Sequence, residues 1–327
     1  MRGIPLLCSL LILTAGCAAS PDVAPAGRPA AEAPSAESAP AERPETARRA
    51  AAQTRLLKIT DLTPRPGEKV GVGMPIIVRF SHPVPDKKAV ERALSVTSTK
   101  STVGAWHWTK NAQGRQLAIF RPKRWWPADQ KVVFKAGLQG VKAGKNLVGG
   151  ADVRSTFTIG DEHVVKANAK THLAEAYRDG ELVRRWKVSM GGGGDRRADG
   201  IDYWQTSSGI HLVMDHRKRE RMRSGPQDKE DWDTWVEYAT RISASGEYVH
   251  ASNGETWCLG RQNCSHGCVR SSRDDAAWFF RWSYRGDPVV ITGTERKLPW
   301  NNGWSYHQMP WKQWLAGSAL KTPVVTS

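Results

Sequence analysis

The feature that most constrains this chain is a long succession of short apolar runs, rich in β-branched and aromatic residues and separated by glycine, proline and asparagine. Between residues 55 and 160 this spacing predicts an all-β unit, a β-sandwich. One short helix is expected at residues 87–93, with Asp86 as its N-cap. The expected strands of this unit are residues 76–80, 94–97, 105–109, 117–120, 131–135 and 156–159.

Residues 161–293 predict a second unit that is also rich in strands. Asp179 and Gly180 lie between two apolar runs, and an Asp-Gly pair in this place is a strong signal for a β-hairpin. Ser272, followed three residues later by Asp275, forms a capping-box pattern and predicts one clear helix over residues 274–284. Further strands are expected at residues 171–177, 182–188, 210–214, 235–242, 247–250 and 288–291. The chain is therefore expected to be mainly β.

The first 17 residues have the pattern of a secretory signal peptide. Arg2 supplies a positive start, residues 4–13 form an apolar stretch, and small residues precede Cys17. The small–small–Cys ending resembles a bacterial lipobox. We therefore expect an exported protein whose Cys17 carries lipid and anchors it to the outer face of the cytoplasmic membrane, in the cell wall.

Two segments flank the expected folded units. Residues 18–54 contain 14 Ala and 6 Pro but no aromatic side chain. They cannot bury enough apolar surface to offset the entropy of ordering, which predicts a disordered tether. Residues 294–327 form a Trp- and Pro-rich C-terminal extension. Its tryptophans are expected to pack against the protein rather than bind sugars, and they are Trp300, Trp304, Trp311 and Trp314.

The charge of the chain indicates an anionic partner. Its 48 Lys and Arg residues outnumber 32 Asp and Glu residues, which gives a net charge of +16. A basic surface attracts nucleic acid, an anionic membrane or an acidic wall polymer alike. Because the chain carries an export signal, we expect a wall polymer and no nucleic acid.

The candidate chemistry lies in one stretch of the second unit. Cys268 follows Ser265, His266 and Gly267, and His250 precedes it by 18 residues. A cysteine nucleophile reacts as a thiolate, so it needs a nearby imidazole to take its proton. A glycine beside it lets the backbone approach an acyl group and present N–H donors to a developing oxyanion.

Residues 265–268 (Ser-His-Gly-Cys), preceded by His250, resemble the active-site signature of the YkuD-type L,D-transpeptidases. Residues 70–78 and 104–108 resemble the Ig-like domain that precedes the catalytic domain in actinobacterial members, and residues 310–317 resemble their C-terminal extension. The resemblance implies an Ig-like β-sandwich followed by a β-rich catalytic domain. It implies no metal and no organic cofactor.

The resemblance also implies a reaction on peptidoglycan. Cys268 would attack the carbonyl of the third residue of a donor tetrapeptide stem and expel D-alanine. The side-chain amine of an acceptor stem would then take the acyl group from the thioester, which gives a 3→3 cross-link. His250 would be the general base, oriented by the backbone carbonyl of Ala251. The residues that would frame the oxyanion site are His266, Gly267 and Cys268, with Ser265 nearby.

Substrate contacts are implied in the same way. Ser245 and Gly246 match a turn that contacts the donor peptide, and the Arg270 guanidinium could pair with a stem carboxylate. A mobile lid would run from Met214 to residue 235 and contain Trp232. Carbapenem β-lactams would acylate the same cysteine.

Other interpretations use the same residues. Cys258, Cys264 and Cys268, with His250 and His266, could bind zinc, although their spacing is not a common finger pattern. If Cys17 takes lipid and Cys268 stays free, Cys258 and Cys264 remain to form a disulfide. The same thioester could also serve L,D-carboxypeptidase action or protein attachment to peptidoglycan. A non-enzymatic wall-binding module is a further alternative.

Overall fold

The structure is a computed structural model that describes residues 54–226 and 228–327. The expected signal peptide, Cys17 and nearly all of the expected tether lie outside the described residues. Within the described ranges, no helix is long and apolar enough to cross a membrane.

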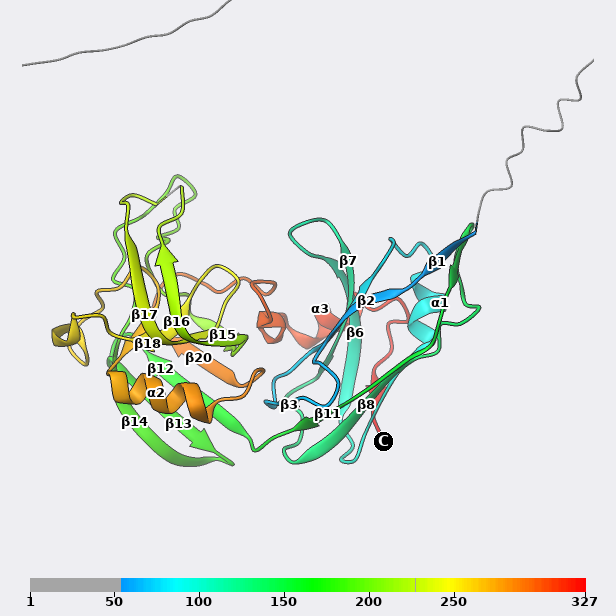
Figure 1. The fold of residues 1–327 in the computed structure, drawn as a ribbon, viewed down its shortest axis with the longest axis horizontal. Helices are drawn as coiled ribbons and strands as arrows, with labels where there is room; N and C mark the ends of the chain where they lie inside the picture. Colours follow the sequence, from blue (N-terminus) through cyan, green and yellow to red (C-terminus); the bar gives the residue numbers. More distant parts are fainter. Residues whose placement is uncertain (1–53, 227) are drawn as a thin grey trace, which may run out of the picture. The chain divides into compact units, whose positions relative to one another are not determined.

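The first part of the described chain is a β-sandwich (Figure 1). One sheet has the order β2-β4-β7-β6-β21 and the facing sheet the order β3-β11-β8-β5, while β1, β10 and β9 form a small third sheet. Trp106 packs edge-on against Phe120 of its own sheet and Phe134 of the facing sheet, and all three are buried. Aromatic side chains from alternating positions of both sheets therefore fill the core.

The strands of this part have the following bounds: β1 Arg55–Leu57, β2 Ile59–Thr63, β3 Lys69–Val70, β4 Ile76–Phe80, β5 Leu94–Ser98, β6 Val103–Lys110, β7 Gln116–Pro122, β8 Gln130–Ala136, β9 Lys142–Gly144, β10 Leu147–Gly149 and β11 Val153–Ile159. The expected helix is present as α1, Lys87–Arg92, and the Asp86 carboxylate accepts the Ala89 N–H at its start.

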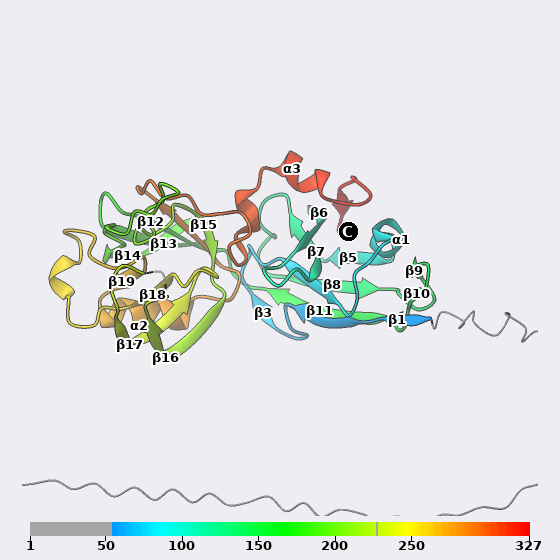
Figure 2. The ribbon, with the colours of Figure 1, turned by 90° about the horizontal axis from the view of Figure 1, so that it is seen from above.

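The second part is built on one nine-stranded sheet, with the order β15-β20-β12-β13-β14-β19-β18-β17-β16 (Figures 1 and 2). Helix α2, Arg273–Trp282, packs against β17 and β18. The strands are β12 His163–Asn168, β13 Leu173–Arg178, β14 Glu181–Ser189, β15 Gly209–Leu212, β16 Asp215–Arg223, β17 Asp233–Arg241, β18 Tyr248–Ala251, β19 Val269–Ser271 and β20 Pro288–Thr292. Thr256–Cys258 form a short 3-10 helix, η2.

The hairpin and the helix start expected in this part are both present, whereas strands β12, β16 and β19 are not among the strands expected from the sequence. Asp179 and Gly180 have φ angles of 52° and 85° between β13 and β14, as a tight hairpin turn requires. Ser272 caps α2 by accepting the Asp275 N–H at 3.1 Å. The mainly β fold class predicted from the sequence is confirmed.

The C-terminal segment returns to the first part of the chain. Its strand β21, Val324–Val325, pairs antiparallel with β6. Its helix α3, Trp311–Ala316, places Trp314 fully inside the protein, where the indole N–H donates to the Ala105 carbonyl at 3.0 Å. A second 3-10 helix, η3, spans Ser305–Gln308. The packing of Trp314 agrees with expectation, whereas the return strand has no signal in the sequence.

Candidate active site

A cavity of about 660 Å³ lies among the β16–β17 hairpin, β18 and the loop that precedes β19. It brings together most of the residues that the sequence indicated: Trp232, Ser245, Gly246, His250, Ser265, His266, Gly267, Cys268 and Arg270. Several cationic and acidic side chains share the lining, which suits a polar, charged substrate.

Strand pairing brings the imidazole and the thiol to one place. His250 lies on β18, and Cys268 directly precedes the parallel neighbouring strand β19. The Nδ1 atom of His250 lies 2.7 Å from the Ala251 carbonyl oxygen. Because a carbonyl only accepts hydrogen bonds, Nδ1 carries the ring proton, and Nε2 keeps the lone pair that can take a proton.

Burial holds both groups in their neutral forms. It raises the pKa of the Cys268 thiol to about 12, although a backbone hydrogen bond from Tyr248 acts in the opposite direction. It lowers the pKa of His250 to about 4, against the effect of its bond to Ala251. At neutral pH the site therefore holds a thiol and a neutral imidazole rather than a thiolate–imidazolium pair.

The loop that carries Cys268 is fixed by Ser265. Its hydroxyl donates to the Cys268 carbonyl at 2.6 Å and accepts the Gly267 N–H at 3.2 Å. Gly267 has a φ of +128°, a conformation that favours glycine. The thiol of Cys268 faces the Gly246 carbonyl, with an Sγ–O distance of 3.7 Å. The turn thus presents the sulfur at the cavity wall.

Comparison with known proteins identifies the family of this chain. A model of the bacterial Ig domain matches residues 31–142, and a model of the YkuD L,D-transpeptidase catalytic domain matches residues 162–291. L,D-transpeptidase 1 of Mycobacterium tuberculosis is 30% identical over 236 residues, which cover 72% of this chain and 85% of that protein. The chain belongs to the L,D-transpeptidase family.

A second relative and a solved structure agree with membership of the L,D-transpeptidase family. L,D-transpeptidase 2 of Mycobacterium tuberculosis is 34% identical over 257 residues, which cover 78% of this chain but only 61% of that relative. The solved structure of the LD transpeptidase LdtMt1 in complex with imipenem matches with a TM-score of 0.59 and 26% identity, over 72% of this chain and 100% of that one. The resemblance seen in residues 265–268 is thereby confirmed at the level of the family.

In this family member, most of the segment expected to be a mobile lid is strand β16 and the residues that join it to β17. Strand β16 pairs with β17 along its length, so its run of arginines is held by backbone hydrogen bonds. Trp232 precedes β17 and stacks on His266 in the cavity, with ring centroids 5.4 Å apart. Met214 is placed elsewhere. Its sulfur packs near Gly303 of the C-terminal segment, and it does not line the cavity, contrary to the expected substrate contact.

Arg270 differs from its expected role as a free partner for a stem carboxylate. Its guanidinium already donates to Glu255, and one of its nitrogens lies 3.5 Å from the Cys264 sulfur. Cys264 forms a disulfide with Cys258. The two sulfurs are therefore not available as thiolate ligands for zinc, and Cys268 is the free cysteine of the described chain.

Sequence reasoning missed four residues around the site. Glu255 pairs with Arg270, and Tyr248 directs its backbone N–H at the Cys268 sulfur. Glu247 lies almost fully buried in the cavity wall, and Thr206 donates to the Gly267 carbonyl. Each of them acts through a contact between segments that are distant in the sequence. Such a contact leaves no local sequence motif.

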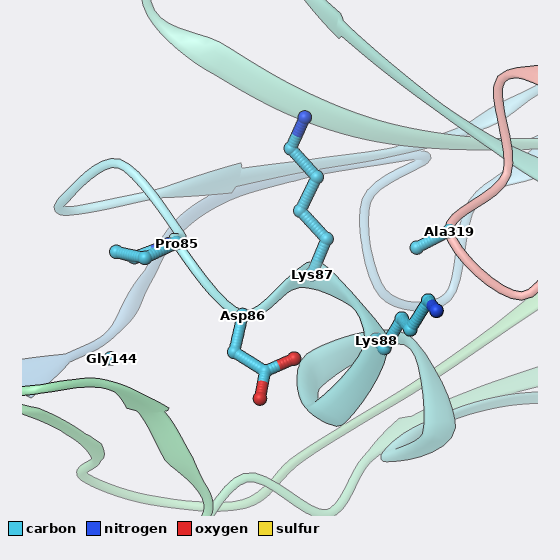
Figure 3. A pocket seen from close by; sticks show the side chains of 6 residues that line it. All are labelled: Pro85, Asp86, Lys87, Lys88, Gly144 and Ala319. Carbon is cyan, nitrogen blue, oxygen red and sulfur yellow. The ribbon is translucent and has the colours of Figure 1, made fainter.

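A second hollow, of about 560 Å³, lies beside α1 in the first part (Figure 3). Lys87 and Lys88 extend from the helix, and the Asp86 carboxylate is engaged in capping it. The six lining residues include no cysteine, serine, histidine or aromatic side chain. This hollow therefore offers no counterpart to the chemistry of the Cys268 cavity.

Proposed function

We propose that this chain is a peptidoglycan L,D-transpeptidase that forms 3→3 cross-links. The observation that carries the proposal is that the free thiol of Cys268 shares one cavity with His250, whose Nδ1 is fixed and whose Nε2 is the basic nitrogen. Membership of the L,D-transpeptidase family supports the same reaction class.

The neutral resting pair determines how the first step runs. As a donor stem binds, the thiol proton passes to His250 Nε2 while sulfur attacks the carbonyl of the third residue. The C–N bond to D-alanine then breaks, and His250 returns the proton to the departing amine. The product of this half-reaction is a thioester on Cys268.

The second half-reaction resolves the thioester. The side-chain amine of an acceptor stem attacks the acyl carbon, its proton passes through His250, and the C–S bond breaks to restore the thiol. Water in place of the amine would give carboxypeptidase action, and a protein amine would give protein attachment. The same Cys268 and His250 serve all three, so the acceptor alone distinguishes them.

We also propose where the protein is located and which β-lactam inhibits it. A net charge of +16 favours an anionic cell wall, and the signal pattern before Cys17 supports export with a lipid anchor. The structural neighbour LdtMt1 is bound to imipenem, a carbapenem. We propose that imipenem likewise acylates Cys268 here, since its strained carbonyl meets the same sulfur, whose proton passes to His250 during the attack.

The test is mass spectrometry of the protein incubated with a disaccharide tetrapeptide, with the Cys268→Ala variant as control. We expect loss of D-alanine and a stem dimer with the wild type and neither product with Cys268→Ala. A tripeptide without dimer would replace cross-linking by carboxypeptidase action. Absence of any product, with no adduct on Cys268, would contradict the enzyme and favour a wall-binding module.

A further inference from the structure

The peptide bond between Gly267 and Cys268 is held from one side by a buried hydroxyl. The Thr206 Oγ1 atom lies 2.8 Å from the Gly267 carbonyl oxygen and 2.8 Å from the Gly191 amide nitrogen. The Gly191 amide can only donate, so the single hydroxyl proton of Thr206 goes to the Gly267 carbonyl. Thr206 has no solvent exposure, so water does not compete for either bond.

Holding this carbonyl also fixes the N–H on the other side of the peptide. In a trans peptide the C=O and N–H groups point in opposite directions. The Gly267 carbonyl points at Thr206, so the Cys268 N–H points away from Thr206. Gly267 and Cys268 both line the cavity.

The backbone N–H groups of Gly267 and Cys268 differ in whether they already donate a hydrogen bond. The Gly267 N–H is already bonded to the Ser265 hydroxyl at 3.2 Å. The Cys268 N–H, by contrast, has no hydrogen-bond acceptor in residues 54–226 and 228–327. It therefore remains able to donate to a ligand atom beside the sulfur.

We infer that Thr206 is a positioning residue that holds the Cys268 N–H as the donor to the oxyanion formed during acylation. The inference rests on the proposed function, since it concerns the attack of Cys268 on a carbonyl. When the C–S bond forms, the carbonyl π pair moves to oxygen, and an N–H fixed beforehand stabilises that charge without reorganisation. Because glycine is conformationally flexible, the Gly267 carbonyl needs a hydrogen bond from another segment to fix its direction.

The test compares two reactions of the same sulfur in Thr206→Val and Thr206→Ser. Acylation by imipenem passes through an oxyanion, whereas alkylation by iodoacetamide displaces iodide and forms none. Both add a known mass to the peptide that contains Cys268, so one mass-spectrometric time course reads each rate in the full chain. We expect acylation to slow by about 10- to 100-fold in Thr206→Val, less than the roughly 10²- to 10³-fold cost of losing an oxyanion donor outright, because the Cys268 N–H is loosened and not removed. Alkylation should stay within about twofold, because it requires no such donor.

Thr206→Ser is the matched control, because it keeps the hydroxyl and should acylate within about threefold of the wild type. Thr206→Ala adds no apolar atoms at the site and serves if the valine variant fails to fold. In Thr206→Ala we expect at least about fivefold slower acylation with alkylation unchanged.

The outcomes separate this inference from the proposed function. Unchanged acylation in Thr206→Val or Thr206→Ala, or equal slowing of both reactions, would overturn the positioning role. A wild-type protein whose Cys268 is alkylated but never acylated would instead contradict the proposed function, and the inference with it.

Discussion

Two buried carboxylates, Glu91 in the first part of the molecule and Glu247 in the second, are equally hidden from solvent but differ in their bonding. Each is 3% exposed. Glu91 accepts hydrogen bonds at both oxygens, from the Trp108 indole and from three groups of the C-terminal segment. Glu247 accepts the Ser207 N–H at 2.7 Å through Oε1, while its Oε2 is buried without a hydrogen-bond partner.

The difference indicates what each carboxylate does. A buried charge whose bonds are all made stabilises the segments that it joins. A carboxylate with one oxygen that accepts no hydrogen bond acts on its neighbours mainly through electrostatic repulsion or attraction. The negative charge of Glu247 contributes to raising the pKa of Cys268. We therefore expect Glu91 to affect stability and not the reactivity of Cys268. We expect Glu247 to affect the reactivity of Cys268, with a smaller effect on stability through its contacts with Arg296 and His211 at 3.9 Å.

The largest effect is expected from His250→Ala, which removes the reactive pair's base. Because the thiol of Cys268 is un-ionised at neutral pH, the variant must wait for solvent to deprotonate it. We expect acylation by imipenem to slow by about 10²- to 10⁴-fold at pH 7. Measured from pH 6 to 10, the deficit should shrink as pH rises, because hydroxide replaces the base. A deficit below threefold at pH 7 would show that His250 is not the base.

A smaller effect is expected from Glu247→Gln, read through the pH dependence of iodoacetamide alkylation. In the wild type, the raised pKa of Cys268 means that the thiolate fraction, and hence the rate, climbs about tenfold per pH unit between pH 7 and 9. Removing the negative charge lowers the pKa of Cys268, so the variant should react several-fold faster at each pH.

The design of Glu247→Gln limits other changes. The amide oxygen can still accept the Ser207 N–H, and the amide nitrogen takes the place of the oxygen that has no partner. The Ser207 bond is therefore kept, and the contacts of Glu247 with Arg296 and His211, both at 3.9 Å, lose their charge, so the melting temperature should fall less than in Glu91→Gln. A wild-type rate that is flat from pH 5 to 8 would indicate a thiolate–imidazolium pair and contradict the neutral resting site.

Local features of this fold could be predicted because a few neighbouring residues determine them. The hairpin at Asp179 and Gly180 needs only positive φ angles, and the cap at Ser272 needs only one hydroxyl before a helix. The order of the nine strands and the return of β21 to β6 depend on contacts between distant segments. The arginine run of β16 resembles a loop because its strand buries little more than Met222.

The candidate site divides in the same way. Cys268, His250 and their neighbours form a motif with a recognisable spacing, and the structure places them around one cavity. Thr206 and Glu247 carry no such signal, since only folding shows that one meets the Gly267 carbonyl and the other loses its contact with water. Residues that act through a neighbour are thus the part of a site that sequence reasoning finds last.

The smallest effect on reactivity, and the sharpest test of the comparison, comes from Glu91→Gln, the same substitution made at the saturated carboxylate. Glu91 Oε2 accepts the Trp108 indole N–H and the Ala319 N–H, while Oε1 accepts the Ser318 hydroxyl and the Leu320 N–H. Whichever way a glutamine amide turns, its NH₂ faces donors, so bonds are lost and not replaced.

We expect Glu91→Gln to reduce the free energy of unfolding by about 2–3 kcal/mol, the scale of a lost hydrogen bond to a charged group. Denaturant unfolding followed by tryptophan fluorescence would measure this loss, and hydrogen exchange should increase first at residues 318–320, whose groups donate to the carboxylate. Acylation of Cys268 by imipenem should keep its wild-type rate under native conditions. A variant that unfolds normally but acylates slowly would reverse the roles of the two carboxylates, because Glu91 would then influence the reaction through the C-terminal segment.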